Sequence, residues 1–204
     1  MEKIEENEEI KNVRHMLQNH EELEHNITIR RNWILERMME LDDMIDGLCH
    51  ITKGNEKLAV SQTNHQQDPV FQVYLRIQDM RDELMILQKA DQELSEREKE
   101  LRRICSIFNR LYSLFPKAYY ITYEIDFLPR TAKTYTWASL SKKMGVGKLM
   151  IGQAKAFTYE VMCELHKANL TTESIIAMSN EELLKYLEQN PSIASQLSKY
   201  YATT

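Results

Sequence analysis

The stretch "ITIRRNWILERMMELDDMIDGL", residues 27 to 48, decides the fold class of this chain. Its strongly apolar side chains follow one another at steps of three and four after a first step of seven, at Ile27, Ile34, Met38, Leu41, Ile45 and Leu48. Because an α-helix turns once in about 3.6 residues, this spacing puts them on one stripe, as in a coiled-coil seam. The chain up to about Lys53 contains no Pro and a single Gly, so we predict that this whole part is helical.

A second heptad-spaced apolar stripe follows and predicts a second helix that packs against the first. The apolar pattern resumes after Pro69 and continues to about Leu114, a helix that would measure roughly 65 Å at 1.5 Å per residue. Between the two patterns, a polar stretch with Gly54 predicts a loop at about residues 54 to 69. We therefore expect an antiparallel coiled-coil hairpin over residues 1–113, or pairing of this region with a second copy of the chain. The residues expected in the second seam are Val73, Ile77, Met80, Leu84, Leu87, Leu94, Leu101 and Phe108.

The composition agrees with an all-α fold and limits other classes. The 204 residues include only 5 Gly and 4 Pro, against 28% charged residues, which favours long helices with few turns. No apolar run approaches the about 20 residues of a membrane span, so we expect a cytoplasmic protein without a membrane partner. The three cysteines lie far apart and form no CxxC pair, which predicts buried, reduced thiols.

The charge of the chain is unevenly distributed. The net charge at pH 7 is −5, yet the segment from Lys117 to Lys167 holds eight Lys and Arg against four Asp and Glu, a balance of +4. The rest of the chain therefore carries −9. Such asymmetry indicates that one part of the molecule faces phosphate while another part does something else.

The basic segment contains a glycine pair that allows two interpretations, in the stretch "KKMGVGKLM", residues 142 to 150. A phosphate-binding loop requires G-x-x-x-x-G-K-[ST], because backbone N–H groups curl around the phosphate and the hydroxyl holds magnesium. Here Lys142 stands where the first glycine belongs, and Leu149 stands where the hydroxyl belongs. We therefore expect neither a nucleotide nor another cofactor.

The second interpretation is a helix-turn-helix domain over residues 117–167. The apolar residues around the glycines have the spacing with which two crossed helices share a small core. Gly145 stands at the predicted turn, where a positive φ is often required, and Gly147 is an acceptable N-cap for a helix that begins near Lys148. The core residues expected from this arrangement are Leu140, Met144, Val146, Ile151 and Ala154.

The helix after the turn would present one face to DNA, and its outward residues are expected to be Lys148, Leu149, Gly152, Gln153 and Lys155. Lysine can bind phosphate as a point charge, and glutamine can form two hydrogen bonds with an adenine edge. An ordinary helical corner without DNA is the alternative. The full set of predicted DNA-binding residues is Thr136, Lys142, Lys143, Gly147, Lys148, Leu149, Gly152, Gln153 and Lys155.

The run "TWASLSKKMGVGKLMIGQAKAFTYEVMCEL", residues 136 to 165, resembles the fourth region of bacterial sigma factors, the helix-turn-helix that reads the upstream promoter element. A long heptad-patterned part followed by such a module is similar to phage-encoded, sigma-like activators of late genes, the ArpU-like type. The resemblance covers about 45 residues, from Tyr119 to Leu165, and implies DNA contacts at Lys148 and Gln153. Leu149 and Gly152 depart from the family pattern, which has charged, DNA-contacting side chains there.

The last part of the chain, residues 168–204, is predicted to be a short helical segment from its capping residues. Ser179 followed by Glu182 has the pattern of a capping box, and Asn190 precedes a proline at a first helical position. Thr171 or Thr172 could begin a further short helix. The role of this segment is not indicated by its residues.

These features predict a DNA-binding transcription regulator of phage or mobile-element type, associated with the nucleoid in the cytoplasm. Its hairpin would dimerise or contact RNA polymerase, and Trp33 beside the first seam is expected to pack. No catalytic triad pattern and no metal-ligand spacing occurs, so we expect neither an enzyme nor a metal site. Two alternatives stay open: a module that binds a host protein such as RNA polymerase through the hairpin, and a phage DNA-packaging recognition protein.

Overall fold

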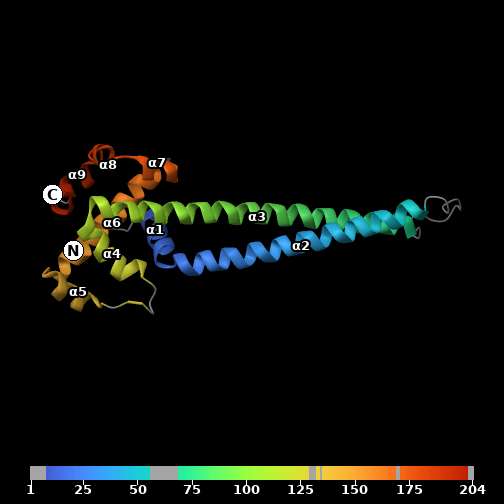
Figure 1. The fold of residues 1–204 in the computed structure, drawn as a ribbon, viewed down its shortest axis with the longest axis horizontal. Coiled ribbons are helices and arrows are strands. Elements are labelled where there is room, and N and C mark those ends of the chain that lie inside the picture. The colour runs from blue at the N-terminus through green and yellow to red at the C-terminus, as the bar shows by residue number, and fades with distance from the viewer. Residues whose placement is uncertain (1–7, 56–68, 129–131, 134, 169–170, 202–204) are drawn as a thin grey trace. The chain divides into compact units, whose positions relative to one another are not determined.

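The computed structural model describes residues 8–55, 69–128, 132–133, 135–168 and 171–201. Within these ranges the regular structure is helical, which confirms the predicted all-α class (Figure 1). The elements in chain order are α1 (Glu8–Gln18), α2 (His20–Asn55), α3 (Pro69–Leu114), α4 (Pro116–Thr122), the π-helical turn η2 (Tyr123–Phe127), α5 (Trp137–Met144), α6 (Lys148–Lys167), α7 (Thr172–Ala177), α8 (Asn180–Leu187) and α9 (Pro191–Tyr200).

The chain forms two units. The described residues of 25–98 make up one, called the hairpin below, and those of 1–24 and 99–204 make up the other, called the helical domain. α3 contributes to both, because it runs without interruption from one unit into the other. This division differs from the expected boundaries near residues 113 and 168, because α1 and the last turns of α3 bury side chains in the same core as the C-terminal helices.

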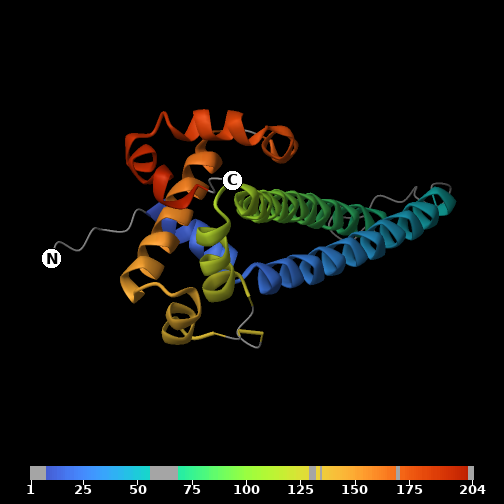
Figure 2. The same cartoon turned by 60° about the vertical axis from the view of Figure 1, so that its left-hand side comes forward.

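The predicted antiparallel hairpin forms within one chain, and α2 and α3 lie side by side in both views (Figures 1 and 2). Ion pairs give the direction of the helices: Arg31 pairs with Asp91 at 2.8 Å, whereas Arg37, further along α2, pairs with Glu83, further back along α3, at 2.9 Å. The apolar residues between the helices come from the two predicted seams. Those that are buried are Ile27, Ile34, Leu41, Ile45, Ile77, Met80, Leu87 and Leu94.

The first helical pattern is interrupted at Asn19, where the sequence predicted continuity. α1 ends one residue before Asn19 and α2 begins one residue after it, and the Asn19 side-chain amide donates to the carbonyl of His15 at 2.9 Å. Val13 and Leu17 of α1 are buried in the helical domain, as is Phe108 of the second predicted seam. Heptad spacing thus identified the helices, but it did not show that α1 and the last turns of α3 pack in the core of the helical domain and not in the hairpin.

The helical domain is built around α6, which packs against α1, α4, α5 and α9 (Figure 2). Its second half is buried nearly all round, as expected for a helix surrounded by others. The first two turns bury far fewer residues, so the N-terminal end of α6 is largely exposed. The buried residues of α6 are Ile151, Ala154, Phe157, Thr158, Tyr159, Val161, Met162, Cys163 and Leu165.

η2 widens the end of α4 and brings its last residues against other helices. The ring of Phe127 stacks on that of His20 at 4.2 Å between centroids and on that of Phe108 at 5.1 Å. Asp126, next to it, is only 3% exposed. A π-helical turn often accompanies a functional constraint, and here it directs a carboxylate into the domain.

The C-terminal helices begin at the predicted caps. The Ser179 hydroxyl accepts from the N–H of Glu182 while the Glu182 carboxylate accepts from the N–H of Ser179, which is a complete capping box. Thr171 caps α7 and Asn190 caps α9. These helices belong to the helical domain, because they bury Ile175, Leu183, Leu187, Ile193 and Leu197 in its core.

No helix in the described part of the chain combines the length and the hydropathy that a bilayer span requires. The three cysteines are free thiols, of which Cys163 is buried and Cys49 and Cys105 are partly buried. Burial raises the pKa of the Cys105 and Cys163 thiols to about 11. Both are therefore protonated at neutral pH, when the reactive thiolate form is scarce.

Candidate nucleic-acid interface

α5 begins with a reciprocal pair of hydrogen bonds between Thr136 and Ser139. The Thr136 hydroxyl accepts from the N–H of Ser139 at 3.2 Å, and the Ser139 hydroxyl accepts from the N–H of Thr136 at 2.8 Å. Thr136, one of the predicted DNA contacts, is thus the N-cap of α5 and is exposed. Its local role is to start the helix at this residue.

The turn after α5 has the predicted geometry. Gly145 has φ 64° and ψ 26°, the left-handed conformation that glycine adopts without steric cost. Its N–H donates to the carbonyl of Lys142, and the N–H of Val146 donates to the carbonyl of Ser141. Gly147 then adopts an extended conformation as the N-cap, and α6 begins at the next residue. The glycine pair is therefore the turn between two helices.

The predicted core between α5 and α6 is confirmed. Leu140 of α5 and Ile151 of α6 are fully buried, and Ala154 is 1% exposed. Met144 and Val146, at the turn, are half-buried against the same core. These contacts set the angle between the two helices, so the exposed side of α6 is presented in one orientation.

The first two turns of α6 expose one face. Lys148, Leu149 and Gln153 are exposed, and Gly152 is half-exposed. Residues three and four positions apart on a helix lie on the same side, which relates Gly152 to both Lys148 and Leu149, and Gln153 to Leu149. These four residues therefore form one continuous surface, called the α6 face below. Leu149 is 75% exposed, the highest fraction of any large apolar side chain in the described part of the chain.

Lys155 does not belong to this surface, so its predicted outward position is wrong. Its ammonium lies 2.8 Å from the Asp126 carboxylate, and the side chain is only 14% exposed. It also lies 5.4 Å from the centre of the Trp137 ring. A buried carboxylate on η2 attracts the lysine inward, an interaction that helical spacing could not reveal. Lys155 therefore connects α6 to η2 and α5.

The Asp126 carboxylate is the centre of a buried polar network. It accepts from the side-chain amide of Gln18 at 2.7 Å and from the hydroxyl of Tyr159 at 2.9 Å, in addition to Lys155. Burial, together with the Asp126 charge, raises the pKa of the Tyr159 hydroxyl, which therefore stays protonated and donates. Sequence reasoning missed this network because Gln18 and Asp126 are 108 residues apart.

The other two predicted lysines are exposed on α5. The Lys143 ammonium donates to the hydroxyl of Tyr120 at 2.6 Å and lies 4.2 Å from the centre of the Tyr135 ring. The hydrogen bond to Tyr120 is the main cause that raises the pKa of Lys143, so this residue keeps its charge. Lys142 is exposed beside it. Lys143 thus holds α5 to α4 and keeps positive charge at the surface.

The segment that contains the α6 face places no acidic residue near it in sequence. No acidic residue occurs between Asp126 and Glu160, a stretch that contains six Lys and Arg. Glu124 and Asp126 are buried. Glu160 and Glu164 lie in the second half of α6 and accept hydrogen bonds from side chains of α9 and of its N-cap residue. The four acidic residues of the basic segment are therefore buried, engaged with the C-terminal helices or distant from the start of α6.

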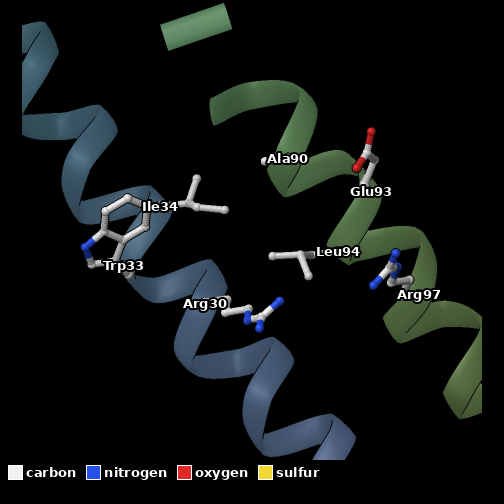
Figure 3. A pocket seen from close by; sticks show the side chains of 7 residues that line it. All are labelled: Arg30, Trp33, Ile34, Ala90, Glu93, Leu94 and Arg97. Atoms are coloured by element: carbon white, nitrogen blue, oxygen red, sulfur yellow. The ribbon is translucent and has the colours of Figure 1, made fainter. Parts of the chain in front are cut away.

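A second candidate surface lies on the hairpin (Figure 3). Trp33, which the sequence predicted to pack, is instead 60% exposed. It borders a groove of about 450 Å³ in which Ile34 of α2 and Leu94 of α3 point toward one another. Two arginines and one glutamate also line the groove. The lining residues are Arg30, Trp33, Ile34, Ala90, Glu93, Leu94 and Arg97.

Among the residues that the structure describes, no three His, Cys, Asp or Glu side chains are grouped so that they could hold a metal ion. No family model, curated protein or solved structure matches the chain. The function therefore has to be inferred from the chemistry of the two surfaces.

Proposed function

We propose that the chain binds double-stranded DNA through α5, the glycine turn and α6, as a transcription regulator of phage or mobile-element type similar to sigma region four. The observation that carries this proposal is the α6 face, which begins with Lys148 and belongs to a stretch with six basic and no acidic residues. In helix-turn-helix proteins the second helix lies in the major groove, and its N-terminal residues contact base edges.

The side chains have different roles in this arrangement. Lys142 and Lys148 contact phosphates, and Gln153 contacts a base edge. Lys143, hydrogen-bonded to Tyr120, contributes positive charge from a fixed position. Lys155 acts indirectly, because its ion pair with a buried carboxylate fixes α6 in the domain.

A titration of the full chain with duplex DNA at increasing salt tests the proposal. We expect the logarithm of the affinity to fall linearly with the logarithm of the salt concentration, because bound lysines release counterions from DNA. Lys148→Ala should weaken binding and reduce that slope by about one. Lys199→Ala, which removes the same charge from the exposed surface of α9, is the matched control and should bind as the wild type. Affinity that is absent or indifferent to salt would contradict DNA binding.

A substitution at Gln153 tests the orientation of α6. Gln153→Ala should weaken binding to the preferred site without changing the salt slope, because the amide carries no charge. Circular dichroism should show unchanged helical content, since this side chain is exposed and alanine favours helix. Equal affinity of this variant and the wild type would mean that another face of the domain meets DNA.

The groove at Trp33 favours a second function, the binding of a protein such as RNA polymerase through the hairpin. Tryptophan and arginine are the residues most enriched in binding hot spots, and this groove combines an exposed Trp33 with Arg30 and Arg97. Capture of purified bacterial RNA polymerase by the full chain tests it. Trp33→Ala should abolish capture and leave DNA affinity unchanged, whereas Lys148→Ala should leave capture intact. Equal capture by Trp33→Ala would contradict this function.

A further inference from the structure

The α6 face contains an exposed apolar side chain as well as a lysine. Leu149 is 75% exposed, and Met150 next to it is 36% exposed. An exposed leucine makes no contribution to the core, and a single one needs no explanation by itself. Here it stands one helical turn before Gln153, on the same side of α6. The pair therefore offers one apolar and one amide group to whatever covers this face.

Gly152, between these two residues, is not required by the packing of the protein. A Cβ atom at this position would meet no other atom within 4 Å, and its φ is not positive. Glycine inside a helix is nevertheless unfavourable relative to alanine, because it loses more conformational freedom. The packing of the chain therefore leaves the backbone of α6 at Gly152 open to the approach of another molecule.

The chemistry of these three residues matches A·T base pairs in the major groove. Thymine presents a methyl group there, which apolar side chains contact. Adenine presents its N6 amino group and N7, to which the Gln153 amide can donate and from which it can accept a hydrogen bond. A glycine lets the helix backbone approach the base edges. Lys142 and Lys148, both exposed, can supply positive charge for the DNA phosphates.

From this arrangement we infer that α6 selects A·T base pairs. In this inference Leu149 contacts a thymine methyl group, Gln153 forms hydrogen bonds with an adenine edge, and Gly152 lets the backbone of α6 approach the base edges in the major groove. The inference rests on the proposed DNA binding and adds to it the sequence class that is read. It also explains why Leu149 and Gly152 differ from the charged residues of sigma-type modules. In this inference Leu149 contacts a methyl group and Gly152 allows close approach of the backbone, so neither position has to contact a phosphate.

Replacing thymine by uracil tests the role of Leu149, since it removes only the methyl group. Duplexes are first selected from a random pool with the wild-type protein, and each thymine of the selected site is then replaced in turn. We expect A·T pairs in that site and one position at which uracil weakens binding about fourfold, the effect of one buried methyl group. Leu149→Ala should bind thymine and uracil duplexes equally.

The outcomes separate this inference from the proposed function. A wild-type protein that binds no duplex contradicts both. Salt-dependent binding without A·T preference, or without any loss on uracil substitution, leaves DNA binding in place and overturns the inference. A loss on uracil substitution that persists in Leu149→Ala also overturns it, because another residue would then contact the methyl group.

Gly152→Ala gives an independent test, because it should raise the melting temperature but lower the affinity for DNA. Alanine should raise the melting temperature, because the helix becomes more favourable and the added Cβ meets no protein atom. The same Cβ should reduce affinity for the selected site at least tenfold, because it stands between the helix and the groove. Gly47→Ala on α2, also a helical glycine with open space, is the matched control. It should raise the melting temperature without changing affinity, and unchanged affinity in Gly152→Ala would overturn the inference.

Discussion

The hairpin and the helical domain are both made of helices, but they are held together differently. In the hairpin, two helices share one seam whose buried residues repeat at heptad spacing. In the helical domain, one core joins residues from Val13 in α1 to Tyr200 in α9. The ion pairs differ as well, since Arg37 and Glu83 of the hairpin are partly exposed, whereas Asp126 of the domain is buried. Regular spacing thus specifies packing between two helices, and convergence of many helices depends on residues far apart in the chain.

The largest expected effect of a single substitution lies in the helical domain, at Phe157. This side chain is fully buried, with ring contacts to Phe115 at 5.0 Å and Tyr200 at 4.5 Å between centroids. Phe157→Ala should lower the free energy of unfolding of this domain by about 3 to 5 kcal/mol, because it leaves a cavity in the buried core. Chemical denaturation followed by circular dichroism measures the change.

Phe71 of α3 supplies the matched control in the hairpin, because its side chain is 39% exposed. Phe71→Ala should change stability by less than about 1 kcal/mol. Equal losses in the two variants would contradict the prediction that burial in the multi-helix core makes Phe157 important for stability.

Removal of the buried carboxylate should have the next largest effect. Asp126→Ala takes away the shared partner of Lys155, Tyr159 and Gln18, and should destabilise the domain by about 3 kcal/mol, since an unpaired ammonium is left with little access to water. Adding Lys155→Met should recover part of this loss, and a double-mutant cycle measures the coupling between the two groups. Strict additivity of the two changes would show that the ion pair contributes nothing.

The corresponding pair of the hairpin should contribute much less. Arg37 and Glu83 are 33% and 44% exposed, so water and salt weaken their attraction. Glu83→Ala should therefore destabilise the chain far less than Asp126→Ala does, and the difference from the wild type should shrink in high salt. A cost as large as that of Asp126→Ala would mean that the hairpin depends on ion pairs as strongly as the domain does.

The smallest expected effect is a pH dependence at the start of α8. The hydrogen bonds from Ser179 hold the pKa of Glu182 below its usual value of 4.5, so its carboxylate stabilises the folded state above that pH. This stabilisation is lost as the pH falls from 4.5 through the lower folded pKa. Glu182→Gln should therefore be less stable than the wild type at pH 7 and equally stable in acid. Glu181→Gln, which changes the same charge one residue away, is the matched control for the loss of charge.

Much of the candidate interface could be predicted from local sequence. Gly145 has the positive φ expected at the turn, and Gly147 caps the helix that begins at Lys148. Leu140 and Ile151 form the expected small core. These features depend on residues within about ten positions of one another, where turn chemistry and helical periodicity are sufficient.

The positions of Lys155 and Trp33 could not be predicted in this way. Helical spacing put Lys155 on the outward face, but a carboxylate on η2 draws it into the domain. Trp33, predicted to pack beside the first seam, is 60% exposed at a groove between two helices. In both cases the outcome depends on which side chains of another element lie opposite.

The sequence by itself determined the helical class, the two seams, the turn at Gly145 and the caps of the C-terminal helices, because each follows from spacing or from the chemistry of neighbouring residues. Only the tertiary structure decided that α1 packs in the helical domain and not in the hairpin, and that the Asp126 carboxylate accepts hydrogen bonds in a buried polar network. It also decided that the start of α6 is exposed while the second half of this helix is buried. These features arise from contacts between residues that can be more than a hundred positions apart, such as Gln18 and Asp126, and a local sequence pattern carries no information about such contacts.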